Sequence, residues 1–105
     1  MRAIAVLSLA ALLLGTSVRA ADDPKVVRVC KVLETVVAKA KVEKPDPDTM
    51  QMWVVFGLAE EFGDDMTYLG EFAGKADELT QPVCPDARDA VIEITGKSSL
   101  SSVVR

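Results

Sequence analysis

The sequence predicts a small all-α domain of four helices, with a short fifth helix at its end, closed by one disulfide bond. Three observations support this fold class. Apolar residues recur at helical rather than alternating spacing from residue 25 onward, and proline and glycine separate the periodic segments. The chain also contains two cysteines, Cys30 and Cys84, far apart in the sequence.

Residues 1–20 have the features of a secretory signal peptide. Arg2 provides a positive start, residues 3–14 are an uncharged apolar run, and small residues lead to a predicted cleavage site after Ala20. The run is too short to span a membrane, which needs about twenty apolar residues. We therefore expect residues 21–105 to form one exported domain, periplasmic or secreted, with no membrane insertion after cleavage.

The exported part has 85 residues, which is near the lower size limit for a self-sufficient core. In an oxidising compartment Cys30 and Cys84 are expected to pair with each other, and two free buried thiols are the alternative. A bond that closes a loop of 54 positions should stabilise the fold by about 4 kcal/mol in the chain-entropy model.

The first predicted helix covers residues 25–41, and its apolar side chains form one stripe: Val26, Val29, Cys30, Leu33, Val36, Val37 and Ala40. Pro45 and Pro47 end it. Asp48 is expected to cap a second helix from Thr49 to Phe62. This second segment is apolar almost all round, so it should be the most buried helix.

A third helix is predicted over residues 66–79, with Leu69, Phe72, Ala76 and Leu79 facing inward. The fourth begins at Pro85, ends near Ile94 and is capped by Gly96. Residues 97–105 form either a short docked helix or a frayed tail, and we favour the helix.

The second and third predicted helices contain small and flexible apolar residues. Gly70 and Gly74 are expected to permit close packing against a bulky side chain such as Trp53 or Phe56. Methionines are expected to fill the core rather than to form a binding surface, although both are known uses. The methionines in this region are Met50, Met52 and Met66.

Charge is distributed unevenly along the exported chain, which carries ten basic and sixteen acidic side chains. Residues 24–44 have a local balance of +4 and residues 45–95 one of −10. We expect the basic first helix to lie against acidic partners within the fold. An acidic chain is a poor nucleic-acid binder, because neutralising phosphates supplies much of that affinity.

The chemistry available to this chain argues against catalysis. It has no histidine, which removes the commonest general base and the commonest metal ligand. Two isolated cysteines are too few for a soft metal site and are not a redox motif. We therefore expect a non-enzyme without metal or cofactor.

Three segments together resemble the periplasmic acid-stress chaperones of the HdeA type and the related small immunity proteins of type VI secretion. They are residues 29–33 around Cys30, the aromatic stretch 52–57, and Cys84-Pro85 with the amphipathic end containing Ser98-Ser99-Leu100. The resemblance implies a signal-peptide-bearing helical domain with one disulfide between an early and a late cysteine. It also implies protein binding rather than catalysis.

Two functions follow as expectations, and a small structural envelope component with no discrete site is a third possibility. The first is a protein-binding domain that acts as a stress chaperone. The second is an immunity or inhibitor protein that blocks a secreted enzyme through its acidic helices. In either case the partner is a protein and the chain is a monomer or homodimer. The candidate partner-binding residues are Trp53, Phe56, Glu60, Glu61, Asp64 and Asp65.

Overall fold

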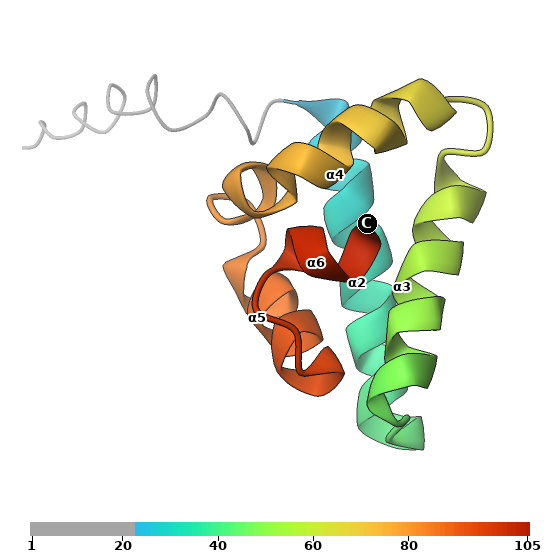
Figure 1. Ribbon diagram of the computed structural model, residues 1–105, viewed down its shortest axis with the longest axis vertical. Coiled ribbons are helices and arrows are strands. Elements are labelled where there is room, and N and C mark those ends of the chain that lie inside the picture. Colours follow the sequence, from blue (N-terminus) through green and yellow to red (C-terminus); the bar gives the residue numbers. More distant parts are fainter. Residues whose placement is uncertain (1–22) are drawn as a thin grey trace, which may run out of the picture.

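The computed structural model describes residues 23–105, which form five α-helices and no strand (Figure 1). The helices are α2 (Pro24–Glu43), α3 (Pro47–Glu61), α4 (Met66–Thr80), α5 (Pro85–Thr95) and α6 (Leu100–Val104). The predicted all-α class is confirmed, including the short helix at the end. The predicted signal peptide, residues 1–20, and its cleavage site lie outside the described residues. Within residues 23–105, no helix has both the length and the apolar content needed to cross a membrane.

The helices α2 and α3 run antiparallel, side by side, and α4 lies across one end of this pair (Figure 1). The helix α5 packs against α2 and α3, while α6 fits between α3, α4 and α5. The predicted apolar stripe of α2 faces this assembly, and all seven of its residues are buried. The long, one-sided helix α2 therefore provides much of the core surface for the others.

The helix α3 begins two residues earlier than the sequence analysis predicted. Its N-cap is Asp46, whose carboxylate accepts a hydrogen bond of 2.8 Å from the backbone N–H of Thr49. Pro47 occupies the first turn, where its missing N–H has no cost. The prediction that Asp48 is the N-cap was wrong. Pro47 takes the first helical position, so the N-cap is the residue directly before it, Asp46.

The prediction that this helix is the most buried one was also wrong. Within α3 only Met50, Val54 and Leu58 are buried, and Phe62 follows directly after its end. Neighbouring helices cover one side of α3 and leave the other open. Five helices built from so short a chain cannot surround any one of them, so an all-round apolar sequence does not produce all-round burial.

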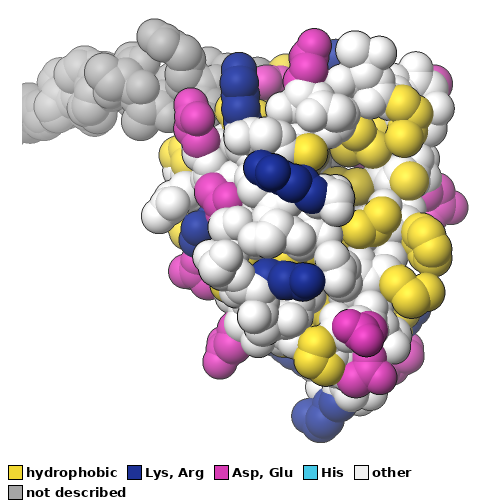
Figure 2. Space-filling model, viewed as in Figure 1, with side chains coloured by type: hydrophobic (Ala, Val, Ile, Leu, Met, Phe, Trp, Pro, Cys, Tyr) yellow, Lys and Arg dark blue, Asp and Glu magenta, His cyan; other side chains and the backbone are white. Residues whose placement is uncertain are grey.

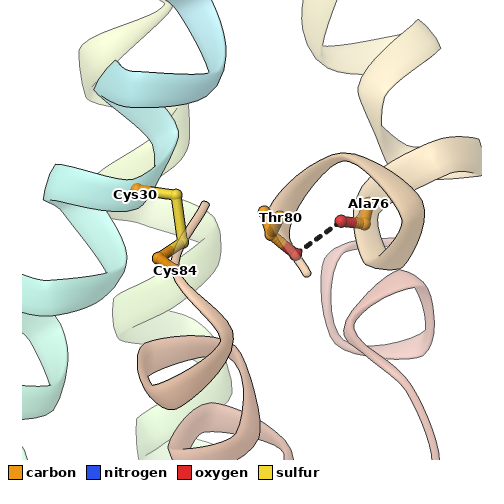
Figure 3. The surroundings of a disulfide bond; sticks show 4 residues. All are labelled: Cys30, Ala76, Thr80 and Cys84. Atoms are coloured by element: carbon orange, nitrogen blue, oxygen red, sulfur yellow. Dashed lines mark hydrogen bonds between the residues drawn. A yellow bond between two sulfur atoms is a disulfide. The ribbon is translucent and has the colours of Figure 1, made fainter. Parts of the chain in front are cut away.

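The disulfide between Cys30 and Cys84 joins the middle of α2 to the start of α5 (Figure 3). Its Cα atoms are 5.9 Å apart, and both cysteines are buried in the core. The turn after α4 places Cys84, because the carbonyl of Thr80 accepts hydrogen bonds from the backbone N–H groups of Val83 and Cys84. The predicted pairing is confirmed. A bond of this kind indicates an oxidising environment.

Asp77 in α4 fixes the last two helices in place. Its carboxylate accepts hydrogen bonds from the backbone N–H groups of Leu100 at 2.8 Å and Ser101 at 3.1 Å. It also pairs with the guanidinium of Arg88 in α5 at 2.8 Å. The first N–H groups of a helix lack partners within that helix and carry a partial positive charge, so this acid suits the start of α6.

Replacing Cys84 by serine should lower the free energy of unfolding by about 3 kcal/mol and leave a free thiol at Cys30. Urea denaturation of the variant, and of the parent chain with and without a reductant, would measure this loss. The reduced parent should behave like Cys84→Ser. Equal stability before and after reduction would show that the crosslink contributes nothing.

The Asp77 contacts predict a specific pH dependence. Burial acts to raise the pKa of Asp77, but the backbone hydrogen bonds from Leu100 and Ser101 and the contact with Arg88 outweigh it and hold the pKa below the ordinary 3.8. Because the pKa of Asp77 is lower in the folded state, the stability that its contacts add is complete at pH values above its pKa in the unfolded chain. That stability is lost as the pH falls through the folded pKa.

We therefore expect Asp77→Asn to cost about 2 kcal/mol at pH 7, because it removes charge-assisted hydrogen bonds. The difference from the parent should shrink at a second pH well below the ordinary 3.8, as protonation of Asp77 removes this charge from the parent as well. Urea midpoints at the two pH values test this, with Glu78→Gln as the matched exposed control. An undiminished difference at low pH would contradict the assignment.

Candidate protein-binding surface

One side of α3 presents apolar side chains to solvent. We call the four residues Met52, Val55, Phe56 and Ala59 the α3 outer face. They stand at positions i, i+3, i+4 and i+7, so they share one face of the helix. Phe56 is 61 % exposed and Met52 is 51 % exposed. Large apolar side chains on an exposed, contiguous face mark interaction surfaces more often than isolated ones do.

The outer face continues into a groove between α3 and α4. The groove has a volume of about 390 Å³ and is bounded also by the end of α6. It is lined mainly by Val55, Ala59, Met66, Leu69, Gly70 and Val104. Figure 2 shows hydrophobic side chains gathered on this face, over α3 and the beginning of α4 at the right of the view. The surface thus spans two helices.

The two glycines of α4 do not have the predicted role. A Cβ atom added at Gly70 or at Gly74 would meet nothing within 4 Å, so neither packs closely against Trp53 or Phe56. The close approach occurs instead at Gly57, where an added Cβ would lie 3.0 Å from a methyl group of Val32. Gly57 therefore lets α3 lie close to α2, and Gly70 leaves the groove open.

The methionine prediction holds for one of the three residues. Met50 is fully buried in the core, whereas Met52 and Met66 are 51 % and 56 % exposed. Met52 is two positions from Met50, which turns it to the far side of α3. Exposed methionines are flexible and polarisable, and such side chains adapt to varied partners.

Of the two predicted aromatic binding residues, only Phe56 lies on the open face. Trp53 is partly buried against the core, on the flank of α3 that faces α2. The ammonium group of Lys39 lies 4.2 Å from the centroid of its ring. A cation over an indole face is a favourable contact, so Trp53 helps to hold α2 and α3 together.

Two of the four predicted acidic residues make ion pairs inside the fold. Glu61 accepts a 2.8 Å hydrogen bond from Arg28, and Asp65 accepts a 2.9 Å hydrogen bond from Lys25. Asp65 also caps α4. The hydrogen bond with Lys25 lowers the pKa of Asp65 and raises that of Lys25. The expected contact between the basic first helix and acidic partners is therefore present.

The other two predicted acids, Glu60 and Asp64, are exposed, and neither has an ion-pair partner among the described residues. They lie at the C-terminal end of α3 and in the turn that follows it. At the N-terminal end, Asp46 and Asp48 are exposed in the same way. Acids thus stand near both ends of α3, with Glu60 on the side of the helix toward α2, where it borders a hollow with Lys31 and Gly57.

Sequence reasoning missed most of the groove, including Val55, Ala59, Met66 and Leu69. One signal was available. The segment from Thr49 to Ala59 contains no charged residue, although it lies in a chain where about a quarter of the residues are charged. The same signal is typical of a helix that is buried all round. Only the positions of the other helices decide whether such a segment is fully buried or has one exposed apolar face.

Among the described residues, no group of three acidic or cysteine side chains is placed to hold a metal ion. No protein-family model, curated protein or solved structure matches the chain. The functional interpretation therefore depends on the surface itself.

If Phe56 belongs to a surface rather than to the core, Phe56→Ser should change the free energy of unfolding by less than about 1 kcal/mol. Phe72 is only 1 % exposed, and Phe72→Ser should cost more than about 3 kcal/mol. Thermal and urea unfolding of the two variants give the comparison. Similar losses in both would place Phe56 in the core.

Proposed function

We propose that this chain is an exported, non-catalytic protein-binding domain. The observation that carries the proposal is the exposure of three large apolar side chains, Met52, Phe56 and Met66, on one face of the domain. Burying such side chains against a partner is favourable at about 25 cal/mol per Å² of apolar surface. A disulfide-stabilised helical framework keeps this face exposed without loss of the fold.

The leading form of this function is a stress chaperone in the periplasm, as the resemblance to HdeA-type proteins implies. The Asp77 contacts supply a physical route. As the pH falls, protonation of Asp77 weakens its hold on α6, and Asp65 loses its pair with Lys25. The helix α6 covers the core through Leu100 and Val103, both fully buried. Its loosening would add apolar surface beside the groove.

We expect the purified protein at about pH 2–3 to slow the aggregation of an acid-unfolded client, measured by light scattering. Asp77→Asn should act at a higher pH than the parent, because α6 is already less firmly held. The exposed control Glu78→Gln should behave like the parent. Failure of the parent to slow aggregation at any ratio to client would exclude the chaperone role.

The alternative is an immunity or inhibitor protein that neutralises a secreted effector enzyme. One observation favours it: residues 45–74 contain seven acidic residues and no lysine or arginine. A surface of one sign steers a partner of the opposite sign. Capture of one stoichiometric, salt-sensitive enzyme from an envelope extract would support it. A broad set of clients bound only in acid would support the chaperone.

A further inference from the structure

We propose that Cys84 is the thiol through which the crosslink forms. In the folded, reduced domain it reacts first with a disulfide donor, and Cys30 then closes the bond. This assignment goes beyond the proposed protein binding and does not depend on it. Three features distinguish the two cysteines: the element that carries each one, a hollow beside Cys84, and the position of Cys84 at the start of a helix.

The two cysteines lie on elements of different kinds (Figure 3). Cys30 lies inside the twenty-residue helix α2, on the stripe that faces the core, one turn before the fully buried Leu33. Cys84 lies in the short connection between α4 and α5, where Pro82 and Pro85 are exposed. A connection opens locally at a lower cost than the interior of a packed helix. Cys84 is therefore the easier thiol to present to a reagent.

A hollow of about 670 Å³ between α2 and α5 includes Cys84 in its lining and does not include Cys30. We call this hollow the α2–α5 groove, and its walls include the small side chains of Ala38 and Ala90. Both cysteines are almost fully buried in the crosslinked domain, at 4 % and 5 % exposed. A reagent therefore needs a route to the sulfur atoms, and the groove is a route that leads to Cys84.

Cys84 is also the N-cap of α5, and its side chain makes no capping hydrogen bond in the crosslinked domain. The first N–H groups of a helix have no partner within the helix and carry a partial positive charge. After reduction these groups would stabilise a thiolate at Cys84, and the thiolate is the form that attacks a disulfide. Cys30 lacks such donors, because N–H groups inside a helix are already bonded to its own carbonyls.

The reaction takes place in two exchange steps. The thiolate of Cys84 attacks one sulfur of the donor, the donor's S–S bond breaks, and its other sulfur leaves as a thiolate. The thiolate of Cys30 then attacks the Sγ of Cys84, and the remaining half of the donor leaves as a second thiolate. The chain gives up two electrons and two protons, and the donor is reduced to two thiols. Because α2 packs against α5, Cys30 is already beside the intermediate.

Competition between the two thiols of one molecule tests this order. The purified chain is reduced, its helical content is checked by circular dichroism, and it is exposed briefly to a limiting amount of iodoacetamide. Peptide mass spectrometry then measures the label on each cysteine. We expect at least roughly tenfold more label on Cys84 than on Cys30. In concentrated urea the two should be labelled alike, because the preference comes from the fold.

Variants with one thiol test the exchange step itself. Cys30→Ser and Cys84→Ser each stop at the mixed disulfide, because the second thiol is missing. The donor is bis(2-hydroxyethyl) disulfide, which is neutral and so is not selected by the charges of Glu34, Lys41 and Asp86 at the groove. Mass spectrometry follows the adduct with time. Cys30→Ser should react at least roughly tenfold faster than Cys84→Ser.

A substitution in the groove tests the route. In the Cys30→Ser background, Ala38→Trp places a large side chain on the groove wall and should slow the reaction of Cys84 severalfold. Thr35→Trp is the matched control, because Thr35 is also exposed on α2 but lines a different hollow, beside Gly57. It should leave the rate unchanged.

Equal labelling of the two cysteines in the reduced chain, or more label on Cys30, would overturn the assignment. The same holds if the reduced chain is unfolded, since the bond would then form before the groove and α5 exist. A preference that persists in urea would show that the fold does not cause it. Equal rates for Ala38→Trp and Thr35→Trp would overturn the groove as the route to Cys84.

Discussion

The crosslink between Cys30 and Cys84 is the constraint on which the rest of the structure depends. It ties α2 to the start of α5, so the first and fourth helices of the described chain are joined covalently. A long loop closed covalently removes much of the entropy of the unfolded chain. A domain of this size has only a small hydrophobic core. The stability that the crosslink adds helps to offset the apolar surface that the fold leaves exposed.

The proposed function rests on the incomplete burial of α3. Gly57 brings one flank of the helix close to α2, and Met50 and Val54 complete the contact with the core. Among the helices of residues 23–105, none covers the opposite flank, which carries the exposed Met52 and Phe56. A fold that needed only stability would gain from polar residues there, because exposed apolar side chains favour aggregation. Their presence is the basis for proposing a protein partner.

Electrostatics divides the acidic residues into two groups. Asp65, Glu61 and Asp77 face basic groups or helix N–H donors within the fold, and they hold α2, α4, α5 and α6 in register. Asp48 and Glu60 are exposed to solvent near the two ends of α3. The first group links stability to pH, and the second is available to a partner. One acidic composition therefore supports both a response to acid and a preference for basic partners.

The sequence by itself determined the helical class, the seven-residue stripe of α2, the cap at Gly96 and the pairing of the cysteines. These depend on local periodicity, backbone preference and the number of available thiols, all of which are visible along the chain. It also indicated that basic and acidic segments would meet. Only the tertiary structure decided which side of α3 is buried, which methionines are exposed, and that Asp77 reaches α6. An apolar helix has the same sequence pattern whether three neighbours surround it or two, because burial depends on the arrangement of the other helices.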